Sequence, residues 1–243
     1  EDEEKLMAAW DDVTGEELDP EEVEKARAEE VQFYKSRKVY TKVPKSQCWK
    51  RTGKAPIPIR WIDHNKGDKT RPNYRSRLVA KDIKKDARPD LYAATPPLEA
   101  LKTILALAAK GKKGTGIMVN DVKRAYFYAP ATREIYVELC EEDREPGDEE
   151  MCGILNYSMY GTRDAAQNWQ IEFTSTLLQM GFNQGKSSPC VFHHRQRNLR
   201  TFVHGDDYVT AGDKRDLRWM EDELSKRYEI TTTVIGGEEG DER

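Results

Sequence analysis

The sequence predicts an α+β fold in which a sheet is backed by helices. A clear helix begins at Pro97, a second spans residues 165–180, and each has apolar side chains spaced for one face. Apolar or alternating segments typical of strands lie before, between and after these helices. The chain has 243 residues, of which 37% are hydrophobic and 35% charged. It is therefore long enough to bury a core, and its surface is expected to be heavily charged.

The first half is expected to contain one helix, one hairpin and much irregular chain. A helix is predicted from Pro20 to about Arg37, because Asp19 can cap it and proline suits a first helical position. Prolines punctuate residues 39–60, which are interpreted as loop and short extended pieces. Residues 58–64 and 74–80 alternate and flank a turn, so they predict a basic β-hairpin.

The helix that begins at Pro97 has an apolar stripe and ends at Lys110 and Gly111. The stripe consists of Leu98, Leu101, Ile104, Leu105 and Ala108. A buried-type strand at 117–122 and a second at 135–139 follow, and then an acidic, turn-rich loop at 141–150. After the helix at 165–180, strands are predicted at 190–194 and 199–204, and a third long helix at 214–227.

Charge is distributed unevenly along the chain. Residues 1–30 carry fourteen acids and three bases, a net charge of −11. Since the whole chain has a net charge of −4, the other residues together carry +7. An acidic arm on a mildly basic body fits a nucleic-acid binder, although a solvated acidic helix explains the charge equally well. Residues 1–19 are expected to be a disordered arm and 237–243 a disordered tail.

Other classes of protein are disfavoured. No apolar run has the length of a transmembrane helix or the form of a signal peptide, so an intracellular protein that is not secreted is predicted. The four cysteines are scattered without a CxxC pair, which favours reduced thiols over a zinc site.

Carboxylates mark the candidate site. Asp121 ends an apolar strand, and Asp206 and Asp207 occupy a tight turn after Gly205, between two apolar runs. Adjacent aspartates repel each other, and a divalent cation would compensate. Nucleotidyl transfer uses two such ions about 4 Å apart, held by carboxylates that converge from different segments. Ordinary turn chemistry is the competing explanation for the pair taken alone.

Four motifs in order resemble the copia-type retrotransposon reverse transcriptases. They are the segment RLVAK at 77–81, DVKRAYF at 121–127, SMYG at 158–161 followed by Trp169, and GDD at 205–207. PIRW at 58–61 and LSKRYE at 224–229 are also similar to that family. The resemblance covers roughly residues 22–236. It implies a polymerase palm, an antiparallel sheet backed by helices, over about 96–236, and a β-rich fingers subdomain over about 38–95.

The resemblance implies an RNA-directed DNA polymerase from a retrotransposon Pol polyprotein. Asp121, Asp206 and Asp207, with the backbone carbonyl of Val122, would hold two Mg²⁺ ions, for which Mn²⁺ can substitute. The partners would be an RNA or DNA template with its primer, deoxynucleoside triphosphates, and other polyprotein segments such as thumb, RNase H and integrase, which are not visible in this chain.

Further residues of the site follow from the same resemblance. Arg77 would clamp the triphosphate, with help from Arg75 or Lys81, and the fork geometry of arginine suits phosphate oxygens. For Arg75 and Lys81, plain surface charge is an equal explanation. Tyr126 would exclude a 2′-hydroxyl, although it can also be a core aromatic. Tyr160 and Gly161 would support the nucleotide and template.

Two departures from the family qualify the expected activity. His204 stands where the family usually has an aromatic, two positions before the aspartate pair, and with Gly205 it would lie at the primer end. Asp164 stands where the family commonly has glutamine. A carboxylate facing a triphosphate would be unfavourable, and a helix cap at Ala165 is the preferred explanation for Asp164.

Two alternatives remain open at this stage. An RNA-directed RNA polymerase would also fit the GDD motif, but Tyr126 argues against it. A truncated, catalytically silent domain that binds nucleic acid would fit the departures at His204 and Asp164, while the three aspartates argue against it.

Overall fold

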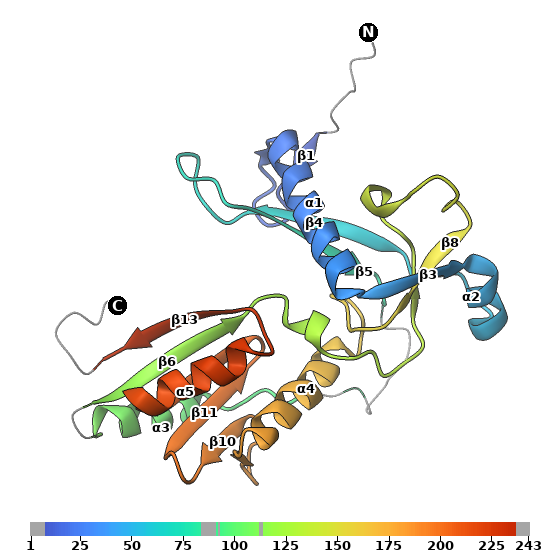
Figure 1. Cartoon of the computed structure of the whole chain (residues 1–243). Helices are drawn as coiled ribbons and strands as arrows, with labels where there is room; N and C mark the ends of the chain where they lie inside the picture. The colour runs from blue at the N-terminus through green and yellow to red at the C-terminus, as the bar shows by residue number, and fades with distance from the viewer. Residues whose placement is uncertain (1–7, 84–90, 92, 112–113, 237–243) are drawn as a thin grey trace. The chain divides into compact units, whose positions relative to one another are not determined.

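The computed structural model describes residues 8–83, 91, 93–111 and 114–236 (Figure 1). The chain divides into two compact units, each described by itself below. The first unit comprises residues 1–88 and 130–165, and the second comprises 89–129 and 166–243. The predicted mixture of helix and sheet is confirmed. The predicted division near residue 95 differs from these units, because residues 130–165 return to the first unit.

An antiparallel sheet forms the centre of the second unit. Its strand order in the described part is β13-β6-β12-β11-β10-β9, and every neighbouring pair is antiparallel. The strands are β6 (Thr115–Val122), β9 (Asn183–Gln184), β10 (Val191–His194), β11 (Leu199–His204), β12 (Asp207–Asp213) and β13 (Ile230–Ile235). The strands predicted at 117–122, 190–194 and 199–204 are confirmed, and β9, β12 and β13 complete the sheet.

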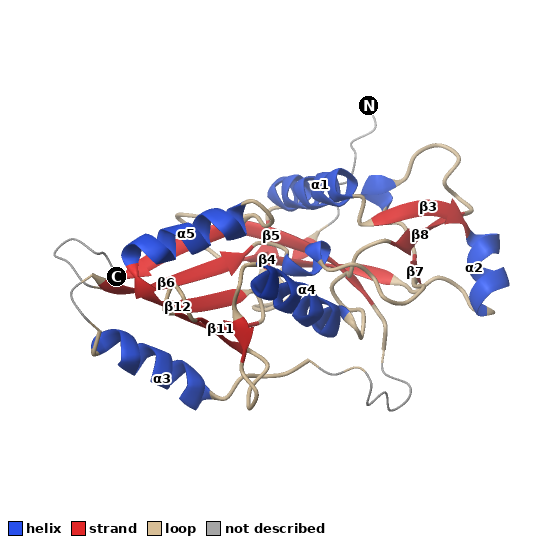
Figure 2. Ribbon diagram, turned by 60° about the horizontal axis from the view of Figure 1, so that its bottom comes forward, coloured by secondary structure: helices blue, strands red, loops and turns tan. Residues whose placement is uncertain are grey.

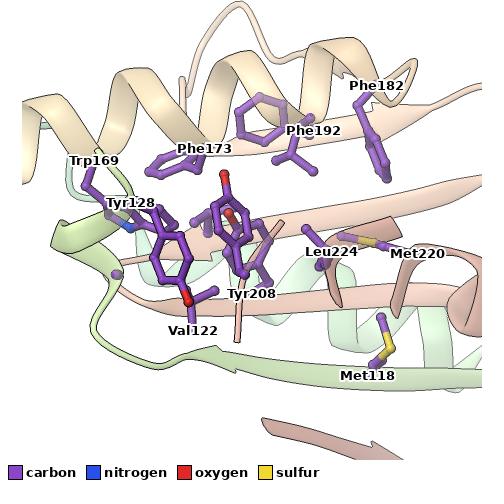
Figure 3. Close-up of a cluster of buried hydrophobic side chains, with 14 of the residues drawn as sticks. Met118, Val122, Tyr128, Trp169, Phe173, Phe182, Phe192, Tyr208, Met220 and Leu224 are labelled. Atoms are coloured by element: carbon purple, nitrogen blue, oxygen red, sulfur yellow. The ribbon is translucent and has the colours of Figure 1, made fainter. Parts of the chain in front are cut away.

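Helices cover both faces of this sheet. On one face, α4 (Ala165–Gln179) and α5 (Lys214–Ser225) enclose the main core, in which Trp169, Phe173, Tyr208 and Met220 are buried (Figure 3). On the other face lies α3 (Leu98–Ala109), and Figure 2 shows α3 and α5 on opposite sides of the strands. Alternate residues of β12 serve the two faces, as the period of a strand requires. Tyr208 belongs to the first core and Ala211 to the second.

The predicted stripe of α3 is only partly correct. Ile104 is buried, and Leu101 and Ala108 pack beside it together with Ala100. Leu98 and Leu105 are 57% and 38% exposed. The helix therefore rests on the sheet through a narrower strip than its apolar residues suggest.

The described part of the first unit contains three small sheets, one of which, β1-β2, is described below. The predicted hairpin is confirmed as β4 (Ile59–Asn65) paired with β5 (Tyr74–Ala80). A three-stranded sheet has the order β3-β8-β7, with β3 (Tyr40–Pro44), β8 (Met151–Leu155) and β7 (Tyr136–Val137). The strand predicted at 135–139 is thus shorter than expected. The acidic segment that follows β7 contains a 3-10 turn, η2 (Glu141–Asp143).

Proline stands at the start of two helices of the first unit. Helix α1 (Pro20–Arg37) has the expected cap, because the Asp19 side chain accepts hydrogen bonds from the N–H groups of Glu21 and Glu22. Residues 39–60 were expected to be irregular, which is wrong for α2 (Lys45–Thr52). Pro44 stands at the N-cap of α2 and Gly53, at φ 66°, ends it. These residues bound a helix there; they do not exclude one.

The expected disordered arm is wrong for residues 8–19. They form a small hairpin, β1 (Ala9–Trp10) and β2 (Glu17–Leu18), whose Ala9 and Leu18 pack with Val23 and Tyr74. Residues 1–7 and the predicted tail at 237–243 lie outside the described residues. The acidity of the segment misled the prediction because two of its acids make specific bonds: Asp11 caps the turn, and Asp12 accepts a hydrogen bond from the N–H of Asp63.

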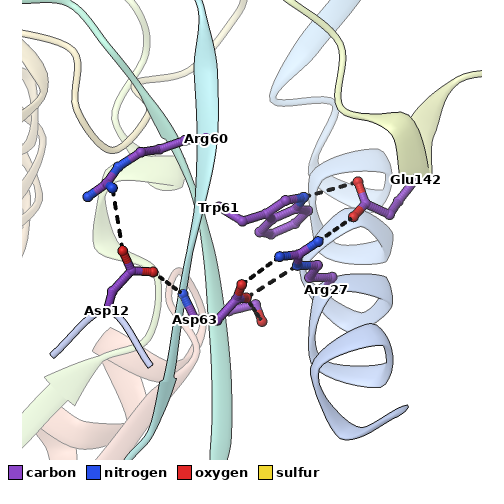
Figure 4. Close-up of polar contacts among 7 residues, drawn as sticks. Asp12, Arg27, Arg60, Trp61, Asp63 and Glu142 are labelled. Atoms are coloured by element: carbon purple, nitrogen blue, oxygen red, sulfur yellow. Dashed lines mark hydrogen bonds and ion pairs between the residues drawn. The ribbon is translucent and has the colours of Figure 1, made fainter. Parts of the chain in front are cut away.

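Polar contacts hold α1 against β4 (Figure 4). The Arg27 guanidinium lies 2.6 Å from the Asp63 carboxylate and 3.4 Å from Glu142. The indole N–H of Trp61 donates to Glu142 at 3.0 Å, and Arg27 lies over the Trp61 ring. Figure 4 also shows Arg60 reaching Asp12. Residues 8–19 and α1 therefore belong to the folded part of the first unit.

All four cysteines are buried free thiols. Burial raises the pKa of the Cys140 thiol to about 12 and that of Cys152 to about 11. Such thiols are protonated at neutral pH and are poor nucleophiles and metal ligands.

Candidate active site

The three aspartates singled out in the sequence meet at one end of the second unit's sheet. Asp207 is the direct register partner of Asp121 in the β12–β6 pair. His204 pairs with Asp207 across the β11–β12 hairpin, which leaves Gly205 and Asp206 as its two-residue turn. Directly opposed residues of antiparallel strands have Cα atoms about 5 Å apart. The carboxylates therefore come from two strands and the turn between two of them.

The turn has a defined backbone. Gly205 adopts a φ of 62°, in the region that favours glycine, and Asp206 does not have a positive φ. This arrangement fits a type II′ turn, which has glycine at its first central position and suits the twist of a hairpin. Two hydrogen bonds anchor the turn: the Val122 N–H donates to the Asp206 carbonyl at 2.9 Å, and the Trp169 indole N–H donates to the Gly205 carbonyl at 2.7 Å.

The electrostatics of the cluster disfavour the ionised form of Asp207. The pKa of Asp207 is raised, first by partial burial and then by the negative charges of Asp206 and Asp121, while His204 opposes the shift. Like charges held together by a rigid sheet create a need for positive charge. A cation placed among these side chains would remove the repulsion.

The donor set matches the chemistry of magnesium, which prefers carboxylate and carbonyl oxygens. Among the described residues, however, no group of three His, Cys, Asp or Glu side chains already stands in a metal-binding arrangement. Val122 is buried beside the carboxylates. The residues thus fit a divalent cation by type, charge and position on the backbone.

Tyr126 occupies a distinctive place after Asp121. Arg124 has a positive φ of 53° and precedes a 3-10 turn, η1 (Ala125–Tyr128). Phe127 and Tyr128 are buried, and the Tyr128 hydroxyl accepts a hydrogen bond from the Glu229 N–H. Tyr126 remains half-buried against the same core. The aromatic run therefore separates into two core residues and one partly accessible ring.

The predicted phosphate-binding residues belong to the first unit. Arg75 and Arg77 lie on the half-buried face of β5, and Lys81 is exposed just beyond its end. The Arg77 guanidinium lies 4.8 Å from the centre of the Tyr160 ring. Its Nε is buried and has no hydrogen-bond partner among the residues that the structure describes. The Tyr160 ring therefore orients this guanidinium.

Tyr160 and Gly161 are held against the end of β5. The Ala80 N–H donates to the Tyr160 carbonyl at 2.8 Å. Gly161 has a φ of 81°, and a Cβ there would collide with the Ala80 carbonyl. The structure therefore brings Arg77 and Tyr160 into contact within the first unit. The order of the motifs in the sequence did not predict this contact.

Asp164 is buried in an ion pair. Its carboxylate lies 2.8 Å from Arg133, which also binds Asp82 at 3.1 Å, and only 1% of the Asp164 side chain is exposed. Asp82 in turn accepts a hydrogen bond from the Arg163 N–H. The charge of Asp164, which raised doubt in the sequence, is thus compensated by Arg133.

Sequence reasoning missed the contacts of two residues, one in each unit. Arg133 lies in a segment without a recognisable pattern, and its role depends on chain distant in sequence. Trp169 was expected on one face of its helix and was used as part of a family motif, but no contact with the aspartate turn was expected. The signal that could have indicated more is its indole N–H, because a buried tryptophan normally needs a hydrogen-bond partner.

Residues 38–235 match the protein family described as reverse transcriptase (RNA-dependent DNA polymerase), and the chain belongs to this family. The matched range lies within the 22–236 expected from the motifs. The resemblance to retrotransposon reverse transcriptases is confirmed.

Curated relatives are polyproteins of plant transposons. The retrovirus-related Pol polyprotein from transposon TNT 1-94 of Nicotiana tabacum is 28% identical over 187 residues, which are 73% of this chain and 14% of the relative. Those from transposons RE2 and RE1 of Arabidopsis thaliana are 29% and 27% identical over 72% of this chain and 12% of each relative. This chain therefore spans only a small part of the polyproteins it matches. No helix among the described residues is long and apolar enough to cross a membrane.

Proposed function

We propose that this reverse transcriptase domain catalyses RNA-directed DNA synthesis. In that reaction the primer 3′-hydroxyl oxygen bonds to the α-phosphorus of a deoxynucleoside triphosphate, the bond to pyrophosphate breaks, and the hydroxyl proton is released. The observation that carries the proposal is the register of Asp121 opposite Asp207, next to a turn that presents Asp206, in a chain of this family.

The carboxylates of Asp121, Asp206 and Asp207, with the Val122 carbonyl, would hold two Mg²⁺ ions. Bound there, the ions would lower the pKa of the attacking hydroxyl and neutralise charge on the leaving phosphate. The chain's own contribution is a rigid support: the sheet sets the spacing of Asp121 and Asp207, and the anchored turn presents Asp206. His204 is exposed before the turn, where it would meet the primer end with Gly205.

In this proposal the second unit is the polymerase palm and the first unit supplies the fingers. Arg77 would clamp the triphosphate, with its guanidinium oriented by the Tyr160 ring. Arg75 and Lys81 would add positive charge, and Gly161 would give the template close access to the backbone. Positioning and electrostatics then account for catalysis, as in phosphoryl transfer generally.

The nucleic-acid partners would be an RNA or DNA template and its primer. Contacts would be made mainly through phosphates, so binding should weaken as salt rises. The relatives are named as Pol polyproteins, which supports a longer product with thumb, RNase H and integrase segments. The same names support an intracellular site of action, in a cytoplasmic particle or the nucleus.

Tyr126 distinguishes a DNA polymerase from an RNA polymerase. If its half-buried ring excludes a 2′-hydroxyl, the protein should prefer deoxynucleotides, and Tyr126→Ala should reduce that preference by roughly tenfold or more, since steric exclusion is worth a few kcal/mol. Incorporation of deoxy- and ribonucleotides on one RNA template measures the ratio. Preference for ribonucleotides by the unsubstituted protein would establish the RNA polymerase instead.

Primer extension with Mg²⁺ or Mn²⁺ on an RNA template tests the proposal directly. Mn²⁺ binding, measured by calorimetry, should be lost when Asp206→Asn and Asp207→Asn are combined. If this chain extends no primer but a longer chain with downstream sequence does, the missing segments are the cause. If neither extends a primer, the silent nucleic-acid-binding domain is the better description.

A further inference from the structure

The catalytic turn is held by a side chain from a different element. The indole N–H of Trp169, on α4, donates to the Gly205 carbonyl at 2.7 Å. Trp169 is only 2% exposed and lies at one end of the row of buried aromatic side chains in Figure 3. A residue deep in the core thus bonds directly to the backbone next to Asp206.

Packing fixes the direction of this indole. Its ring makes edge contacts with Phe173 at 5.8 Å and with Tyr228 at 5.4 Å between ring centres. Tyr228 is itself held by hydrogen bonds to Thr176 and Glu172. Because these neighbours leave the ring little freedom, its N–H is a preorganised donor at a constant position.

Two consecutive carbonyls of the turn are held from two sides. Trp169 binds the Gly205 carbonyl, and the Val122 N–H, from β6, binds the Asp206 carbonyl. Glycine has more backbone freedom than any other residue, so a turn that begins with Gly205 can move unless it is anchored. Asp206 has no register partner in the strands of the described chain, and its position therefore depends on these two bonds more than on the sheet.

From this arrangement we propose that Trp169 is a positioning residue for the catalytic carboxylates: its indole N–H holds the turn so that Asp206 stays beside Asp121 and Asp207. The inference rests on the proposed function, because it assigns these carboxylates to cation binding. It adds a residue that touches neither substrate nor cation and acts through the Gly205 carbonyl.

The sharpest test removes the N–H and keeps the ring. Site-specific incorporation of 3-benzothienylalanine at position 169 replaces the N–H by sulfur and preserves the bicyclic shape. The same replacement at Trp219 is the control, because that half-buried ring lies under the Arg197 guanidinium and meets His194 edge to face in the same unit. Trp169→Phe is the encoded second variant.

Two measurements are made on the whole chain. Amide hydrogen exchange at Val122 reports movement of the turn, because that amide donates to Asp206. The replacement at position 169 removes one hydrogen bond and should raise the exchange rate of the Val122 amide by about 2- to 10-fold. The replacement at Trp219 should leave that rate unchanged. Mn²⁺ affinity should fall by a similar factor, which a purely structural contact would not cause.

The outcomes separate the two proposals. Unchanged Val122 exchange, or faster exchange with unchanged Mn²⁺ affinity, would overturn the positioning role while the proposed function stands. If the unsubstituted chain binds no Mn²⁺ and extends no primer, the proposed function fails, and the positioning role fails with it.

Discussion

Asp11 in the first unit and Asp207 in the second are both carboxylates beside a β-hairpin, but their surroundings are opposite. Asp11 is 4% exposed and accepts hydrogen bonds from the N–H groups of Val13, Thr14 and Asn65, with His64 Nδ1 2.9 Å away. Burial by itself would raise the pKa of Asp11, but these donors more than offset it, and the pKa is lowered. Asp207 is exposed, faces two other carboxylates, and has a raised pKa.

The difference distinguishes a carboxylate whose charge the fold satisfies from one that we propose to bind a cation. Asp11 has its charge satisfied by the protein, so it stabilises the fold and has nothing left to bind. Asp207 and its neighbours repel one another, and this repulsion destabilises the fold without a cation. Such unfavourable charge clusters are typical of functional sites. The acidic hairpin at residues 8–19 and the turn at Asp206 therefore place their carboxylates in opposite surroundings, and we propose different roles for them.

The largest expected effect is on catalysis. Asp121→Asn should reduce primer extension by about 1,000-fold or more, because metal electrostatics supply several kcal/mol to the transition state. Asp11→Asn, assayed well below its unfolding temperature, should retain activity. Steady-state incorporation kinetics for both variants measures the contrast. An active Asp121→Asn variant would show that Asp121, like Asp11, is not needed for catalysis.

A smaller effect is expected on stability. Asp11→Asn should lower the free energy of unfolding by about 1–3 kcal/mol at neutral pH, because a charged acceptor of several N–H groups is lost. Since the folded pKa is lowered, this contribution is present above the unfolded pKa of about 3.9 and is lost as pH falls through the folded pKa. Urea unfolding at neutral and acidic pH should show the gap closing. Asp12→Asn, which loses fewer bonds, should cost less.

The smallest effect has the opposite sign. Asp207→Asn should stabilise the metal-free protein at neutral pH, by no more than about 1 kcal/mol since the group is exposed. A carboxyl group with a raised folded pKa contributes stability below its unfolded pKa and loses it as pH rises through the folded pKa. The gain should therefore vanish in acid. Thermal unfolding with added Mn²⁺ should reverse the order, because the cation would stabilise only the unsubstituted protein. Destabilisation by Asp207→Asn without metal would contradict the electrostatic account.

Local features of the fold followed from the sequence by itself. The Asp19 cap with Pro20 predicted α1, the alternating pattern predicted β4 and β5, and apolar runs predicted β6, β10 and β11. These succeed because capping, turn chemistry and side-chain period act over a few residues. The order of the motifs likewise identified the family before any geometry was known.

Tertiary structure decided what depends on distant partners. The pairing of Asp121 with Asp207 is a matter of strand register, and the hold of Trp169 on Gly205 joins α4 to a turn in the sheet. The same reason explains the failures: Asp11 and Asp12 order the amino-terminal hairpin through bonds to β4, and Asp164 is neutralised by Arg133. Sequence determined which groups are present and the local structure of each. Only the folded chain determined which charges are satisfied and which are left for a ligand, since that depends on contacts between segments far apart in sequence.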